Sequence, residues 1–183
     1  MLTLAALIFG VLLGYVSGGR SRRLAAIRFR WTWFVLFALV LQLLIFPLFS
    51  SRPLIPWLHE PLHYLSYALA LVFVAANWRM IPLLVVAAGA ALNLLALAVN
   101  GGKMPASVEA LQAAGSDRIA AELLAQGSFG NVVRMSSATN LNALGDWLHL
   151  PGRIPGATAF SLGDLLISLG LAALVWWGMT RRA

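Results

Sequence analysis

The sequence of 183 residues contains no cysteine, which excludes disulfides, thiolate metal sites and a cysteine nucleophile. Charge is also scarce, because 10% of the residues are charged and 61% are hydrophobic. A typical soluble domain is about a quarter charged and about half apolar. So large an apolar excess cannot be hidden beneath a polar surface. The composition therefore excludes an ordinary soluble domain and predicts an integral membrane protein.

Five segments approach the roughly 17–25 apolar residues that a membrane-spanning helix needs. They are residues 1–17, 31–49, 61–76, 80–99 and 162–179. The segments are apolar on every side, which favours helices over the alternating strands of a barrel. We expect an all-α polytopic protein with a single membrane domain over residues 1–183. Residues 100–161 are expected to form an external cap with short helices at about 107–114, 117–126 and 140–148.

The charges divide unevenly between the connectors of these segments. One side carries eight arginines and no acid, namely Arg20, Arg22, Arg23, Arg28, Arg30, Arg79, Arg181 and Arg182. The other side carries all the acidic residues. Short arginine-rich loops stay in the cytoplasm, which predicts an external N-terminus and a cytoplasmic C-terminus. The net charge of +7 therefore indicates a lipid bilayer as partner and no nucleic acid. The lack of charge before Arg20 argues against a cleavable signal peptide.

The first apolar segment carries small residues at intervals of four. Ala6, Gly10, Gly14 and Gly18 fall on one helix face and allow another helix to approach closely. We expect this helix to be another one of the same bundle. A seam between two copies of the chain is the alternative.

The segment HEPLH at residues 59–63 matches the His-Glu-x-x-His pattern of zinc proteases. That pattern requires two histidines on one face of a helix. Proline suits the first turn of a helix, so a helix that begins at Pro61 leaves His59 outside it. We expect His59 and His63 to be interfacial residues. A zinc site with a third ligand from the cap is the weaker alternative, and no cofactor is predicted.

Two aspartates on the external side could carry chemistry. Asp164 opens the last helix in a Ser-x-x-Asp capping box, so capping is its expected role, although an ionisable residue at membrane depth is also a functional candidate. Asp146 comes near the end of a predicted short helix, where the helix dipole disfavours an acid. It therefore calls for a cationic partner such as Lys103 or Arg153, or for a bound cation.

Asn93, Asn100 and Lys103 complete the candidate set. Asn93 lies about two turns inside the fourth segment, where an amide can bind another helix or a substrate. Asn100 faces the same way, seven residues later. The two glycines that follow Asn100 end the helix and turn Lys103 back toward the external rim. The turn is either simple helix termination or part of a pocket for an anionic head group.

Three short elements together resemble a widespread, uncharacterised family of small bacterial membrane proteins. These are the Asn-Gly-Gly-x-Met-Pro turn at residues 100–105, the stretch ending in Leu-Gly-Asp at residues 140–146, and Ser-x-Gly-Asp at residues 161–164. The threonine of the middle element falls one position earlier than the family pattern. The resemblance implies a bacterial plasma membrane location and supplies no activity.

These observations favour a non-catalytic binding or accessory protein with a polar pocket on the external side. Its candidate ligand-binding residues are Asn93, Asn100, Lys103, Asp146 and Asp164. The expected ligand is a lipid head group, a small molecule or a membrane protein partner. A membrane-embedded hydrolase or transferase that uses Asp146 and Asp164 is the first alternative. A small transporter is the second, although the spanning segments lack the buried charges that ion-coupled transport commonly uses.

Overall fold

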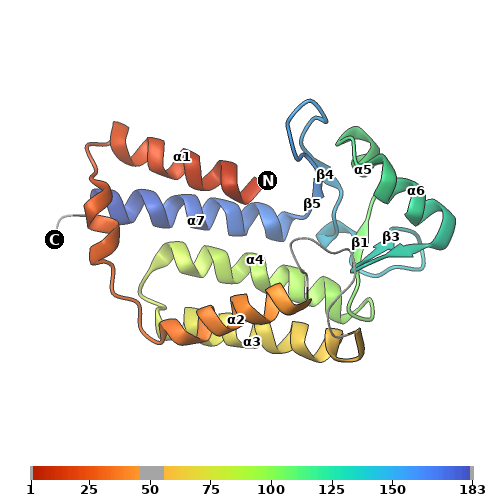
Figure 1. The fold of residues 1–183 in the computed structure, drawn as a ribbon, viewed down its shortest axis with the longest axis horizontal. Helices are drawn as coiled ribbons and strands as arrows, with labels where there is room; N and C mark the ends of the chain where they lie inside the picture. Colours follow the sequence, from red (N-terminus) through yellow and green to blue (C-terminus); the bar gives the residue numbers. More distant parts are fainter. Residues whose placement is uncertain (1, 46–55, 182–183) are drawn as a thin grey trace.

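The computed structural model describes residues 2–45 and 56–181 of the chain, and for Pro56, His59 and Glu60 it describes the backbone alone. Five long helices form the body of the molecule (Figure 1). They are α1 (Leu2–Val16), α2 (Thr32–Ile45), α3 (His59–Ala76), α4 (Ile81–Ala98) and α7 (Leu162–Thr180). The ends of these helices lie within two residues of the ends predicted for the five apolar segments. The C-terminal end of α2 cannot be compared in this way, because residues 46–49 of the second predicted segment lie outside the described residues. The five predicted helices are therefore present.

Two of these helices, α4 and α7, are long and apolar enough to cross a membrane. The apolar helices at Leu2–Val16, Thr32–Ile45 and Pro61–Ala76 are shorter. The structure therefore identifies two candidate spans by length and composition, and five spans remain a prediction.

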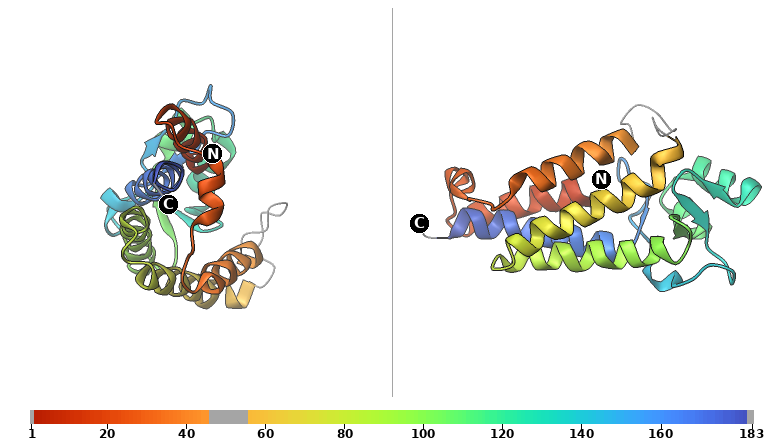
Figure 2. Two further views of the ribbon diagram at one scale, coloured as in Figure 1. Left: turned by 90° about the vertical axis from the view of Figure 1, so that its left-hand side faces the viewer. Right: turned by 90° about the horizontal axis from the view of Figure 1, so that it is seen from below.

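The helices form one curved layer in the order α1, α7, α4, α3, α2, which the view along their axes shows most clearly (Figure 2). Glycines set the spacing between α1 and α7. A Cβ at Gly10 would lie 2.6 Å from the carbonyl oxygen of Ala172, and one at Gly14 would meet Met179. The neighbour at Gly10 is backbone, so a larger residue there would force the two helices apart, whereas at Gly14 the neighbour is a side chain that would have to move. The small-residue face of α1 at Gly10 and Gly14 thus packs within the chain.

The end of the helices far from the cap is crossed by a 3-10 helix, η1 (Ser21–Ala26) (Figure 1). Its Leu24, together with Ile27, packs against Gly178 of α7. A second 3-10 helix, η2 (Pro56–Leu58), directly precedes α3.

The cap between α4 and α7 contains strands as well as helices. Its helices are α5 (Val108–Ala113) and α6 (Asp117–Gln126), with a 3-10 turn η3 (Asn142–Leu144). A three-stranded sheet has the order β1 (Met104–Ala106), β3 (Val132–Arg134), β2 (Ser128–Phe129), and β4 (Leu148–His149) pairs with β5 (Ala159–Phe160). A small core centred on Ala106, Leu111 and Leu123 holds these elements together.

The cap departs from the predicted all-α class in two respects. Its small sheets were not predicted, and the expected third helix at about residues 140–148 is wrong. Only η3 forms there, after Leu141 in a left-handed conformation at φ 51°. The physical reason is tertiary: the backbone N–H of Asp146 donates to the carbonyl of Pro105 over 2.7 Å. This pairing with β1 outweighs the local preference for helix.

The start of α3 is a second correction. The helix begins at His59 and not at Pro61. Pro61 is then its third residue, still in the first turn, where a backbone N–H has no partner within the helix. His59 and His63 therefore belong to one helix at the spacing i, i+4. The side chain of His59 lies outside the described residues.

Candidate functional site at the junction of helices and cap

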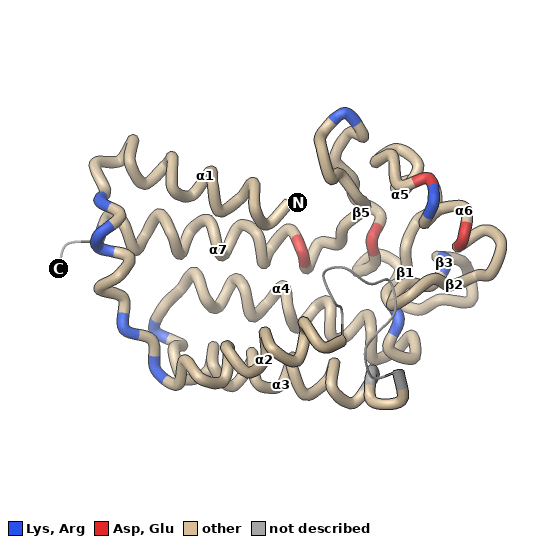
Figure 3. Tube along the Cα trace, in the orientation of Figure 1, with Lys and Arg blue, Asp and Glu red and all other residues tan. Residues whose placement is uncertain are grey.

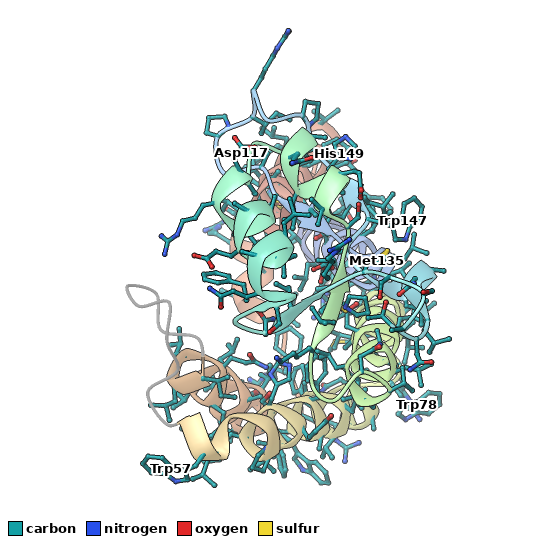
Figure 4. The ribbon with its side chains drawn as sticks, turned by 90° about the vertical axis from the view of Figure 1, so that its right-hand side faces the viewer. Trp57, Trp78, Asp117, Met135, Trp147 and His149 are labelled. Carbon is teal, nitrogen blue, oxygen red and sulfur yellow. The ribbon has the colours of Figure 1, made fainter. Side chains whose placement is uncertain are left out.

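Asp146 is fixed against strand β1. Its N–H donates to Pro105, and its carbonyl accepts the N–H of Ser107 over 2.9 Å. Strand β1 therefore lies between β3 on one side and Asp146 on the other. The preceding Gly145 permits this approach, because a Cβ there would collide with the carbonyl oxygen of Pro105 and the side chain of Met135. Figure 4 shows Met135 near the centre of the cap.

Asp164 lies in the first turn of α7 and forms the predicted capping box. The hydroxyl of Ser161 accepts the N–H of Asp164 over 2.9 Å, and the carboxylate of Asp164 accepts the N–H of Ser161 over 3.2 Å. This confirms the capping role that the spacing predicts.

Asp164 also has a second partner, on a different helix. Its other carboxylate oxygen accepts the side-chain amide of Asn93 over 2.8 Å. The amide oxygen of Asn93 in turn accepts the hydroxyl of Ser161 over 2.8 Å. Gly163 lies between these groups, and a Cβ there would collide with the Asn93 side chain. Asn93 and Ser161 are 5% and 0% exposed, so this network joins α4 to α7 in the interior.

The Asp164 carboxylate acts electrostatically on Asp146 across this junction. Burial, and then the Asp164 carboxylate, raise the pKa of Asp146 from 3.8 to about 7. Within the described part of the chain, the buried Oδ1 of Asp146 has no hydrogen-bond partner. Buried polar atoms are normally paired, so this oxygen marks a position where a ligand or water can bind.

Helix α3 packs against the junction through Tyr67. Tyr67 interacts electrostatically with both Asp146 and Asp164, and it packs against the apolar cluster of Ala96 and Met104. The ring of His63, which is 5% exposed, meets Tyr67 edge to face with centroids 5.1 Å apart. The site therefore gathers residues from α3, α4, α7 and the cap.

A cavity of about 140 Å³ adjoins Asp164. It lies between the start of α1 and the segment that leads into α7. Its other lining residues are Leu2, Thr3, Leu150, Gly156, Ala157, Thr158, Ala159 and Phe160. At about 30 Å³ for each water molecule, this volume accommodates a few waters or a small ligand group.

Asn100 and Lys103 form hydrogen bonds with residues other than the two aspartates. The Asn100 side chain donates to the carbonyls of Ala96 and Asn140 and accepts the N–H of Asn140, each over 2.8 Å. It thereby ties the cap to the end of α4. The ammonium of Lys103 donates to Ser128 on β2 over 3.1 Å. The structure thus joins Asn93 to Asp164, puts Asp146 under the electrostatic influence of Asp164, and gives Asn100 and Lys103 other partners.

The histidines do not assemble a metal centre within the part of the chain that the structure describes. No group of three His, Cys, Asp or Glu residues there could hold a metal ion. His149, a possible third ligand on β4, is exposed on the cap (Figure 4).

The same short motif occurs at both aspartates of the candidate site, and the sequence alone did not show that both copies contribute to it. The tripeptide Leu-Gly-Asp occurs twice, at residues 144–146 and 162–164. In both places the glycine, which has no side chain, allows another residue to approach the backbone closely, and the aspartate that follows it belongs to the candidate site. This recurrence was the available signal, although three shared residues are too few to indicate a duplication.

A comparison with protein families supports the expected relationship. Residues 26–176 match the model of a family of unknown function (DUF5317), a stretch that includes α2, α3, α4, the cap and most of α7. No curated protein and no solved structure matches the chain. Because the match extends over most of the sequence, the chain belongs to this family of unknown function.

Proposed function

We propose that this chain is an integral protein of a bacterial plasma membrane, with five spanning helices, an external N-terminus and a cytoplasmic C-terminus. The helix surfaces support a membrane location. Phe9, Leu39 and Ile81 are 61%, 55% and 73% exposed, and many further apolar side chains on these helices are exposed as well. Soluble monomers seldom expose large contiguous apolar patches. A bilayer would cover such a surface.

The charge distribution supports the orientation. The end of the helices far from the cap carries basic residues and no described acidic ones, whereas the cap and the adjoining helix end carry residues of both signs (Figure 3). Exposed tryptophans flank the apolar helices at both ends, among them Trp33, Trp57 and Trp78 at 80%, 79% and 59%. Arginine-rich connectors on the cytoplasmic side and interfacial tryptophans are typical of membrane proteins.

We further propose that the protein is a non-catalytic binding protein whose site at Asp146, Asp164 and Asn93 receives a cationic group from the external side. The group would be an amine or guanidinium of a small molecule, a lipid head group or a partner protein. The observation that carries this proposal is the buried Oδ1 of Asp146, which has no hydrogen-bond partner among the described residues and is under the electrostatic influence of the Asp164 carboxylate.

The chemistry of the site favours a cation over an anion. Two carboxylates in a buried place repel one another, and a cation between them would relieve that repulsion. Lys103, which could have attracted an anionic head group, donates to Ser128 instead.

Binding can be tested on the purified protein in nanodiscs, with ethanolamine, putrescine and arginine methyl ester as probes. We expect at least one probe to raise the melting temperature of the wild type at neutral pH. The double variant Asp146→Asn and Asp164→Asn should lose this response. The variant Glu122→Gln is the matched control, because Glu122 lies on the surface of α6, paired with Gln126. If the double variant responds as the control does, the proposed site is wrong.

A membrane hydrolase or transferase is the second candidate, and one observation favours it. A carboxyl group with a pKa near 7 beside a second carboxylate is an arrangement that acid–base catalysis uses. Asp146 would then give its proton to a leaving group while Asp164 accepts one from the attacking water or hydroxyl. The candidate predicts turnover of a lipid-linked or peptide substrate that Asp146→Asn abolishes. Binding without turnover for every such substrate would leave the first candidate.

A further inference from the structure

An apolar groove lies at the other end of the helices from the cap. Its volume is about 310 Å³, and its wall is almost entirely apolar. It is lined by Leu7, Ile8, Val11 and Leu12 of α1, Leu24 of η1 and Val175 of α7. Ile8 and Leu12 are 53% and 58% exposed, so the groove is open to the surroundings of the helices.

Arginines stand at the η1 end of this groove. Arg23 donates to the carbonyls of Met179 and Thr180, which fixes η1 across the end of α7. Leu24 turns toward the helices, where it both lines the groove and contacts Gly178. Arg20 and Arg22, on either side of the start of η1, are exposed. The groove therefore includes a residue of η1, the short helix that also carries the exposed Arg22 and that directly follows the exposed Arg20.

We propose that this groove binds one anionic phospholipid of the cytoplasmic leaflet, with an acyl chain along α1 and α7 and the phosphate on Arg20 and Arg22. The inference rests on the membrane placement proposed above and is independent of the aspartate site. Charge complementarity selects an anionic head group, because basic residues near a membrane surface attract anionic lipids. The apolar wall selects a lipid over free phosphate, which gains nothing from the contact with Leu7 or Val11.

The test compares phosphatidylglycerol with phosphatidylcholine of the same acyl chains, by native mass spectrometry of the detergent-solubilised full chain. We expect the wild type to retain phosphatidylglycerol preferentially. The double variant Arg20→Gln and Arg22→Gln should bind it more weakly by about fivefold for each arginine removed. Val11→Trp, which fills the groove, should weaken the binding of both lipids. Arg79→Gln is the control, since Arg79 lies outside the groove and stacks on Trp78 at 5.4 Å.

The proposal is overturned if the double variant retains phosphatidylglycerol as Arg79→Gln does, or if Val11→Trp binds like the wild type. Displacement of the lipid by millimolar inorganic phosphate alone would show an anion site without a lipid groove and would also overturn it. Extraction of the membrane fraction with alkaline carbonate tests the membrane placement by itself. Failure of the lipid site and failure of the membrane proposal are therefore distinguishable.

Discussion

The side-chain amide of Asn93 on α4 donates to the carboxylate of Asp164 on α7 over 2.8 Å. The same amide accepts the hydroxyl of Ser161, so one side chain satisfies two groups of the α7 N-terminus. The bond connects a helix that leads into the cap with the helix that leaves it. Asn93 therefore holds the Asp164 carboxylate in place for the candidate site, and the amide has a structural role whether or not a ligand binds.

Removal of this amide should destabilise the protein. Asn93→Ala leaves the Ser161 hydroxyl without its acceptor and one Asp164 carboxylate oxygen without its donor, and we expect a loss of about 1–3 kcal/mol in the free energy of unfolding. Chemical or thermal unfolding of the purified protein in detergent measures it. Gln112→Ala, at an exposed position of α5, is the control and should change the stability by less than about 0.5 kcal/mol. Equal stability of the two variants would contradict the role given to Asn93.

The two Gly-Asp glycines should not tolerate a methyl group. In Gly145→Ala the new Cβ meets Pro105, and in Gly163→Ala it meets Asn93, so each variant should lose about 1–3 kcal/mol of stability through overpacking. Both should also lose the response to the cationic probes. Gly130→Ala is the control for backbone strain without steric overlap. Gly130 has a φ of 58°, which disfavours alanine, but a Cβ there would have no neighbour within 4 Å. If all three variants behave alike, the close approach at Asp146 and Asp164 is not what matters.

The sequence predicted the helices well because their signals are local. Long apolar runs, Pro82 near the start of α4 and the Ser161–Asp164 capping box each act within one element. The cap was predicted less well. The segment around Leu141 and Asp146 has a helical pattern of leucines, but its backbone pairs with β1, about forty residues earlier in the chain. Local propensity cannot show such a pairing.

The candidate site could be predicted in part for the same reason. Asn93, Asp146 and Asp164 stood out as polar residues at unusual positions; the structure joins Asn93 to Asp164 by a hydrogen bond and puts Asp146 under the electrostatic influence of Asp164, and their role in binding remains a prediction. That Asn100 and Lys103 have other partners depends on the three-dimensional path of the cap, which brings Asn140 and Ser128 to them. The position of Tyr67 near the two aspartates likewise depends on how the layer of helices curves. No spacing in the sequence fixes these relationships.

The protonated Asp146 should contribute to the free energy of unfolding of the ligand-free protein. This contribution is lost as the pH rises from about 4 to about 7. Burial and Asp164 raise the pKa of Asp146 to about 7 in the folded state, against 3.8 as its ordinary value. Between these values the folded chain holds a proton that the unfolded chain has released, so a rise in pH favours unfolding. The slope reaches at most about 1.4 kcal/mol for each pH unit and levels off above the folded pKa.

Thermal unfolding of the wild type and of Asp146→Asn across this range isolates the contribution of Asp146. Asp164 of α7 and Tyr67 of α3 are the titratable groups that interact with it electrostatically. Other carboxyl groups and the histidines also titrate in this window, but they remain in the variant, so the difference between the two curves belongs to Asp146. A wild-type curve that runs parallel to the variant curve would show that Asp146 is not held protonated.

The proposed orientation predicts which end of the molecule is accessible from outside the cell. Because the sequence has no cysteine, one engineered cysteine gives an unambiguous label. Ala121→Cys on α6 is at an exposed position of the cap, and Ala26→Cys on η1 is exposed at the arginine-rich end. A membrane-impermeant maleimide added to intact cells should label Ala121→Cys and leave Ala26→Cys unmodified until the cells are broken. The reverse pattern would invert the topology, place the aspartate site in the cytoplasm and move the arginine-flanked groove to the outer leaflet.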